Sequence, residues 1–123
     1  MKLNPVVRGD YEELPFAITE PYPDEPGLYQ SRDVSLDTFR FTAKQEVYDD
    51  AAVVEKSTED GGILFTDAGR GELTVVLLRE DLASVTHETD LACSLVGTPP
   101  GTPPKDYTTM FLLPVRFRAT PVA

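Results

Sequence analysis

The single histidine and the single cysteine are the side chains of this chain best suited to nucleophilic or general-base catalysis. His87 lies in Thr86-His87-Glu88-Thr89, between two expected elements, and nothing in the sequence selects a nucleophile for it to activate. Cys93 lies in an alternating apolar segment, where a small buried side chain is expected, and its nearest charged neighbour, Asp90, is acidic. We therefore predict a surface histidine, a buried unreactive cysteine and no enzymatic activity.

Three short acidic segments are the places where oxygen ligands could gather around a metal ion. They are Asp49-Asp50, Glu59-Asp60 and Asp67, and none has the spacing of a twelve-residue EF-hand loop. Residues 67–71 also lack the Gly-Lys-Ser/Thr end of a phosphate-binding loop. Arg8-Gly9-Asp10 spells an integrin-type tripeptide, but a turn that opens a strand explains it. Turn chemistry accounts for these segments, so we predict no metal and no cofactor.

Length, charge and cysteine content narrow the class of protein. The chain has 123 residues, enough for a single domain over residues 1–123, and 11 Lys and Arg against 21 Asp and Glu give a net charge of −10. So acidic a surface disfavours nucleic acid and anionic membranes as partners. One cysteine cannot form an intrachain disulfide, and the sequence has neither a membrane-length apolar segment nor the apolar core of a signal peptide at its N-terminus. We expect synthesis in a cytoplasm.

Residues 61–82 carry the clearest signal for the elements that would position any functional side chain. Apolar and polar residues alternate in residues 63–66 and again in residues 73–77, and the glycine-containing residues 67–71 join them. This pattern predicts a β-hairpin. Because a hairpin buries one face only against a second layer, the pattern favours packed sheets.

Period-2 alternation predicts further strands along the chain. No helical period persists over 11 residues, although residues 79–85 are expected to form one helical turn. Seven or eight short strands result, which predicts an all-β protein, an antiparallel β-sandwich of immunoglobulin-like or jelly-roll type. The strands outside the hairpin are expected at residues 11–19, 39–44, 51–56, 91–96 and 107–120.

The alternation also predicts which side chains form the core. Pro15 and Pro114 fall inside expected strands and lack a backbone donor, so we expect both at edge or bulged positions. The expected core residues are Phe39, Phe41, Leu73, Val75, Leu77, Phe111, Leu113, Val115 and Phe117.

Two proline-rich loops are the expected contact sites for partners. Residues 21–27 belong to a proline-rich, acidic loop, and residues 97–104 repeat Gly-Thr-Pro-Pro twice. Neighbouring prolines favour polyproline II, so the second loop should protrude and stay stiff, and stiff segments lose less entropy when they dock. The acidic residues near the first loop predict a basic groove on the neighbour. The predicted partner-binding residues are Pro21, Tyr22, Pro23, Leu28, Tyr29, Pro99, Pro100, Pro103, Pro104 and Tyr107.

The order of these signals carries a family resemblance over residues 6–120. The matching segments are Arg8-Gly9-Asp10 before a strand, residues 36–38 before the alternating residues 39–44, Gly61-Gly62-Ile63, residues 67–71 leading into residues 72–75, and residues 80–85. In this order the chain resembles small β-sandwich domains of tailed bacteriophages. These include the N-terminal domain of baseplate upper proteins and the sandwich domains of tail-fibre connector and collar proteins.

The resemblance implies a non-enzymatic virion structural protein. It would act as an adaptor that docks onto tail, baseplate, collar or capsid subunits, in several symmetric copies, after synthesis in the host cytoplasm. A capsid decoration protein is the alternative within this class. A small carbohydrate-binding sandwich is a remoter alternative, which the absence of Trp and the scatter of five Tyr disfavour.

Overall fold

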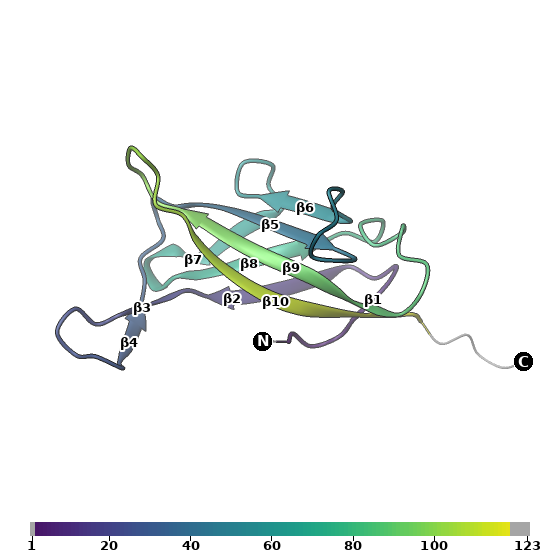
Figure 1. Ribbon diagram of the computed structural model, residues 1–123, viewed down its shortest axis with the longest axis horizontal. Coiled ribbons are helices and arrows are strands. Elements are labelled where there is room, and N and C mark those ends of the chain that lie inside the picture. The colour runs from purple at the N-terminus through teal and green to yellow at the C-terminus, as the bar shows by residue number, and fades with distance from the viewer. Residues whose placement is uncertain (1, 119–123) are drawn as a thin grey trace, which may run out of the picture.

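The computed structural model describes residues 2–118, and within them the protein consists almost entirely of β-strands (Figure 1). The helical content of this part is a single 3-10 turn, η1 (Ala68–Arg70), and no helix there has the length and apolarity to cross a membrane. The strands are β1 (Val6–Val7), β2 (Glu12–Ala17), β3 (Thr19–Pro21), β4 (Tyr29–Ser31), β5 (Thr38–Lys44), β6 (Val54–Ser57), β7 (Ile63–Asp67), β8 (Glu72–Leu77), β9 (Thr89–Thr98) and β10 (Tyr107–Arg116).

Two sheets form the body of the protein. The first sheet has the strand order β1-β10-β9-β5-β6, and the second has the order β2-β8-β7. Neighbouring strands run antiparallel except β1, which pairs in parallel with β10. The first sheet curls like a half-barrel, and β3 and β4 form a separate two-stranded hairpin (Figure 1). The predicted all-β antiparallel class is thus confirmed.

One hydrophobic core lies between the two sheets. Buried and less buried residues alternate along β5 and β9, as period-2 strands with one covered face require. Phe16 of the second sheet contacts Phe111 of the first, with ring centroids 5.3 Å apart, and Phe65 contacts Phe39 at 6.0 Å. The predicted core residues are buried except Phe117, which is partly buried and packs against the core.

The hairpin predicted in residues 61–82 is confirmed by β7 and β8. They pair from Ile63 with Val75 to Asp67 with Glu72, and η1 forms the connection. The strand expected in residues 51–56 is present in part, because β6 at the edge of the first sheet begins at Val54 and ends at Ser57. Local turn chemistry and alternation were sufficient here because both signals lie within a few residues of each other.

Several predicted boundaries differ from the structure. The strand expected at residues 11–19 is divided, because β2 ends at Ala17 and β3 begins at Thr19. The helical turn expected at residues 79–85 is a series of tight turns instead, in which backbone N–H groups bond to carbonyls three residues earlier. Strand β10 ends at Arg116, and the last two residues of the predicted strand, 119 and 120, lie outside the described residues.

The two strand prolines behave differently. Pro15 lies on β2, which pairs only with β8, so its expected edge position is confirmed. The edge position expected for Pro114 is wrong, because β10 has β9 on one side and the N-terminal segment on the other. The carbonyls of Leu112 and Arg116 accept bonds from that N-terminal segment. Pro114 lies two residues from each of them, so its backbone groups face the same N-terminal segment. The N–H that proline lacks would therefore point to that segment, and the pairing with β9 is intact.

Replacement of Phe41 by alanine tests the assignment of the core. Phe41→Ala should lower the free energy of unfolding by about 3–5 kcal/mol, because the ring is 0% exposed and its removal leaves a cavity. The control Leu64→Ala removes a side chain that is 52% exposed and should change stability by about 0.5 kcal/mol or less. Denaturant titration of both variants gives the comparison. Equal losses would contradict the placement of β5.

Candidate interaction surface

Three connections meet at one end of the molecule, which we call the loop end. They are the segment from β2 to β5, the turn from β7 to β8, and the loop from β9 to β10 (Figure 1, left-hand side). Backbone hydrogen bonds join the first two, because Ile18 N donates to the Gly71 carbonyl at 2.9 Å and Val34 N donates to the Ala68 carbonyl at 2.9 Å. The predicted partner-binding residues therefore lie at the same end of the protein.

The proline-rich segment predicted as a loop is the tip of a hairpin, which we call the arm (residues 19–31). Its strands β3 and β4 pair from Thr19 with Ser31 to Pro21 with Tyr29, and Tyr22 N extends the ladder to the Leu28 carbonyl at 3.0 Å. The composition of this segment predicts a loop and not strands, because prolines occupy the tip of the hairpin and the end of one strand. Tyr22, Leu28 and Tyr29 are 41%, 52% and 65% exposed, so the arm carries apolar surface outside the core.

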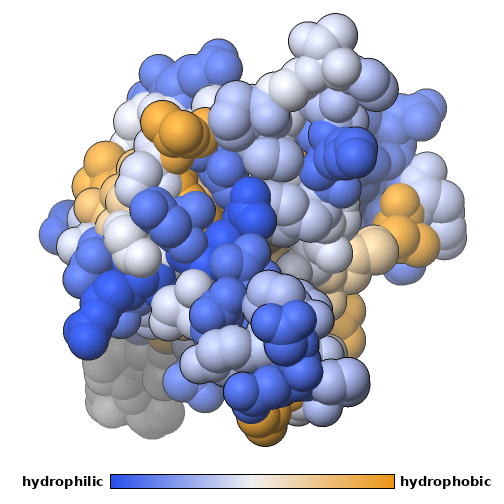
Figure 2. Space-filling view, turned by 90° about the vertical axis from the view of Figure 1, so that its left-hand side faces the viewer, coloured by the Kyte–Doolittle hydropathy of each residue, from blue (hydrophilic) through white to orange (hydrophobic). Residues whose placement is uncertain are grey.

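The loop from β9 to β10 projects at the same end (Figure 1). It is shorter than predicted because β9 continues through Thr98, so the first two residues of the repeat belong to a strand. Pro100, Pro103 and Pro104 are exposed and Pro99 is half-buried. The surface at this end is mainly hydrophilic, and its hydrophobic groups are small and separate (Figure 2).

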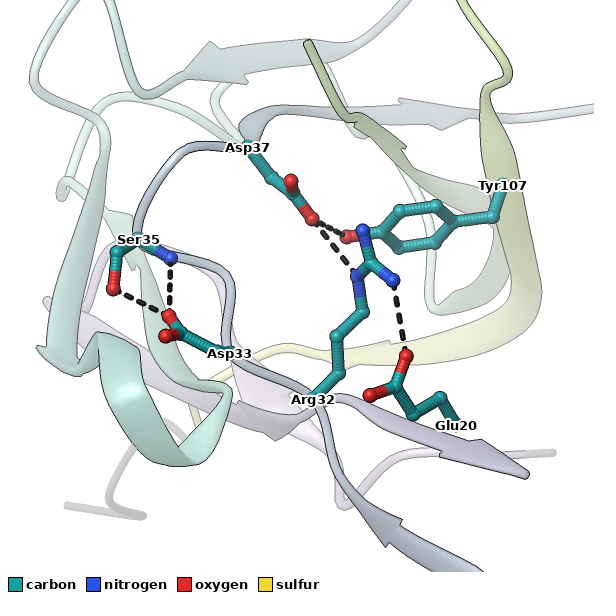
Figure 3. A network of polar contacts seen from close by, with 6 residues as sticks. All are labelled: Glu20, Arg32, Asp33, Ser35, Asp37 and Tyr107. Carbon is teal, nitrogen blue, oxygen red and sulfur yellow. Dashed lines mark hydrogen bonds and ion pairs between the residues drawn. The ribbon is translucent and has the colours of Figure 1, made fainter. Parts of the chain in front are cut away.

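A buried carboxylate organises the base of the loop end (Figure 3). Asp37 is 5% exposed, and its Oδ2 accepts a hydrogen bond from the Tyr107 hydroxyl at 2.5 Å. The same oxygen accepts from Arg32 Nε at 3.0 Å. Arg32 Nη1 donates to Glu20 Oε2 at 3.1 Å, and its guanidinium lies 5.0 Å from the centre of the Tyr107 ring. Arg32 therefore connects the arm to the entries of β5 and β10.

The electrostatics of this network stabilise one protonation pattern. The hydrogen bond to Asp37 raises the pKa of the Arg32 guanidinium. Partial burial, and then the hydrogen bond to Asp37, raise the pKa of the Tyr107 hydroxyl well above its usual range. The tyrosine thus remains a donor and the arginine remains charged through the neutral and moderately alkaline range.

The chain around the network is fixed by local bonds. The Asp33 carboxylate accepts hydrogen bonds from both the N–H and the hydroxyl of Ser35, at 2.9 and 2.5 Å. These bonds lower the pKa of Asp33 and hold the turn that leads into β5. The Tyr107 ring lies directly over Gly97, its partner on β9, where an added Cβ would be 2.3 Å from the ring. The glycine of the repeat therefore provides the space that the ring occupies.

The sequence pattern predicts the two loops but not the network that supports them. Tyr107 was predicted as a docking residue because it follows the second loop, and the structure places it in the support of that loop. Asp37, Arg32 and Glu20 lie outside the two predicted loops and are not among the predicted partner-binding residues. No local signal links these residues, since Asp37 and Tyr107 are 70 positions apart.

The side chains suited to catalysis lie apart from the loop-end network. His87 is exposed, and its Nδ1 is 3.3 Å from the hydroxyl of its neighbour Thr86. Cys93 is buried on β9, and desolvation raises the pKa of its thiol to about 12, so it is a poor nucleophile near neutral pH. The expected surface histidine and buried cysteine are confirmed. Within residues 2–118, no three His, Cys, Asp or Glu side chains are grouped to hold a metal ion.

Comparisons with known proteins do not supply a function. No protein-family model and no curated protein sequence matches this chain.

Gly71, the residue after η1, tests how the arm is attached. Its φ is +74°, and an added Cβ would lie 2.5 Å from the Ile18 carbonyl oxygen and 2.6 Å from that of Arg32. Gly61 has a similar φ of +82° but open space around its Cα. Gly61→Ala should cost about 1 kcal/mol from backbone strain alone, and Gly71→Ala should cost clearly more because backbone atoms must also move. Thermal and denaturant unfolding measure both, and equal costs would mean that the contact is not tight.

Replacement of Tyr107 by phenylalanine tests the network. Tyr107→Phe removes the hydroxyl that donates to Asp37 and should cost about 1.5 kcal/mol at pH 7, the low end for a bond to a charged group, because the ring is only partly buried.

The same variant has a predictable dependence on pH. Because folding raises the pKa of Tyr107 above 10.0, its contribution is complete below pH 10 and is lost as the pH rises further. Tyr107→Phe should therefore lose less stability than the wild type above pH 10. Unfolding curves at pH 7, 9.5 and 11 provide the measurement, and parallel alkaline losses in the two proteins would contradict it.

Proposed function

We propose that this protein is a non-enzymatic adaptor that binds other subunits of an assembly through its loop end. The observation that carries the proposal is the arm, which is held on a charged, hydrogen-bonded base and yet contributes no buried residue to the core. A two-stranded hairpin is marginally stable by itself, so a structure that fixes one outside the core favours a role outside the domain.

The arm has the properties of a contact element. Tyr22, Leu28 and Tyr29 are exposed, and aromatic side chains are enriched among residues that dominate binding energy. The Arg32 network orders the base of the arm before binding, which lowers the entropy lost on association. A shallow hollow of about 270 Å³ lies beside this base, between Ile18, Thr19 and Tyr107. A small apolar group of a partner fits there.

We further propose that the fold is immunoglobulin-like. The second sheet, β2-β8-β7, corresponds to the B-E-D strands of that fold, and β10-β9-β5-β6 corresponds to G-F-C with the additional strand C′. The connections from β2 to β5 and from β9 to β10 then correspond to the B–C and F–G loops, which carry the binding sites of variable domains. This correspondence, a fold-level analogy, supports the assignment of the loop end as the binding surface.

The resemblance to tailed-phage sandwich domains supports a virion as the assembly. The partners in this proposal are tail, baseplate or collar subunits, with a capsid surface as the alternative. The net charge of −10 argues against nucleic acid and anionic membranes as partners.

Arm variants test the adaptor proposal. Tyr22→Ser, Leu28→Ser and Tyr29→Ser together remove the exposed apolar groups of the arm, and a second variant replaces residues 99–104 by a Gly-Ser linker of equal length. The particle that contains the protein would be purified from cells that express each variant, and incorporation would be measured by quantitative mass spectrometry. We expect incorporation to fall by about tenfold or more for the arm variant, since hot-spot side chains dominate binding.

The matched control is Leu64→Ser, which removes an exposed apolar side chain on β7. Circular dichroism and thermal unfolding establish that all variants fold. Normal incorporation of folded arm and loop variants would overturn the proposal and move the contact to a sheet face or an edge strand. The subunits that co-purify with the wild type distinguish a tail from a capsid location.

A further inference from the structure

The second sheet has two edge strands, β2 and β7, because each of them pairs only with β8. An edge strand presents unpaired backbone N–H and C=O groups, to which a strand of another chain can bond. Within residues 2–118, no backbone hydrogen bond reaches the outer side of either strand. The two edges differ, however, in how far they are protected against such pairing.

Three of the four edges of the two sheets carry features that hinder pairing with another chain. On β2, the Ile18 N–H bonds to the Gly71 carbonyl at 2.9 Å, so backbone groups of even-numbered residues face β8 and Pro15 faces outward without a donor. Strand β6 has four residues, and two of them, Glu55 and Lys56, are charged. Strand β1 has only two residues. Short, charged or proline-containing strands are the usual protection of a sheet edge.

The fourth edge, β7, lacks this protection. Its first four residues, 63–66, read Ile-Leu-Phe-Thr and contain neither a charge nor a proline. Leu64 on the outer face of the sheet is 52% exposed, and Phe65, whose ring contacts Phe39 across the core, is still 38% exposed. An exposed apolar edge strand of this kind indicates a site where another strand pairs.

The backbone geometry shows which groups of β7 are free. The Val76 N–H donates to the Gly62 carbonyl at 2.8 Å, which places Gly62 and Leu64 among the residues bonded to β8. Alternation then turns the N–H and C=O groups of Ile63 and Phe65 toward the free edge. A bulge after Phe65 breaks the register and limits the edge to these residues. The free groups are therefore arranged symmetrically on the two sides of Leu64.

This arrangement is complementary to itself. Around a twofold axis beside Leu64, Ile63 of one copy lies opposite Phe65 of the other in an antiparallel pair. Both members of such a pair exchange their N–H···O bonds, so the two pairs together form about four backbone hydrogen bonds. Leu64 of one copy lies opposite Leu64 of the other, with Cβ atoms about 4.5–5.5 Å apart, and each side chain covers the other.

We propose that two copies of this protein pair edge to edge through β7 and form one continuous sheet across a dimer. The contact goes beyond the proposed function, because β7 and the arm are different surfaces and the arm of each copy stays free for another subunit. A twofold contact uses the same edge of both copies and is closed. Pro15 at the other edge of the sheet hinders the addition of a third copy, so pairing ends at the dimer.

The net charge determines how the dimer should respond to salt. Each copy carries a charge of −10, whereas residues 63–66 of the pairing strand are uncharged. The copies therefore repel each other at long range, and the contact itself adds no attraction between charges. Salt screens such repulsion beyond about 8 Å at physiological ionic strength. Dimerisation should thus strengthen as salt is raised from a low to a physiological concentration.

Charged substitutions of Leu64 test the proposal on the purified protein, by sedimentation velocity over a range of concentrations. Leu64→Lys alone and Leu64→Glu alone should each dimerise at least about tenfold more weakly than the wild type, because like charges face each other at the axis. An equimolar mixture of the two should form one-to-one dimers, since the axis then brings opposite charges together. The controls Met110→Lys and Met110→Glu alter a side chain on β10 that is 58% exposed, and they should dimerise as the wild type does.

A cysteine at the axis gives a second measurement. Leu64→Cys should form a disulfide between two copies in the presence of oxidised glutathione, because the expected Cβ separation is close to the roughly 3.8 Å of a disulfide. Met110→Cys is the matched control and should remain unlinked. The native Cys93 is buried and does not compete.

Circular dichroism establishes that each variant folds. A wild type that stays monomeric at every concentration and salt would overturn the inference, as would a mixture without mixed dimers or a Leu64→Cys variant that stays unlinked. Leu64→Ser, the control for the arm, keeps the backbone bonds and places two hydroxyl groups at the axis, so it should still dimerise. Failure of the dimer leaves the adaptor proposal intact, because that proposal is tested through the arm, and normal incorporation of the arm variants leaves the dimer intact.

Discussion

The buried carboxylate of Asp37 is the interaction on which the loop end depends. An anion that is 5% exposed is tolerated only where donors compensate its lost hydration. Arg32 and Tyr107 supply those donors to the same oxygen. Because one residue precedes β5 and the other begins β10, satisfying the carboxylate also fixes where the two strands enter the first sheet. The hydrogen bond from Arg32 to Glu20 extends the same network to the base of the arm.

The core and the projecting loop end are separate parts of this protein. The core between the two sheets contains aliphatic and aromatic side chains, and Asp37 at its margin is the buried charged residue of the described chain. The residues that project from the loop end add little to the core. Small β domains often use this division, in which a rigid scaffold presents loops at one end.

Charged side chains are distributed unevenly over the surface. Acidic residues dominate overall, and many of the cations are already committed to internal ion pairs, such as Lys56 with Asp81 at 2.7 Å. Arg40 and Lys44, which remain unpaired within the described residues, share one strand face.

The sequence by itself determined the all-β class, the β7–β8 hairpin, the strand β5 and most of the core, because alternation and turn chemistry act over neighbouring residues. Tertiary structure decided the rest. The position of Pro114 depends on an N-terminal segment far away in sequence, and the base of the arm is held by bonds from the β7–β8 turn and from Arg32. The contact between Asp37 and Tyr107 spans 70 positions. Such contacts carry no local signal, since they exist only after loop closure has brought the two strands into one sheet.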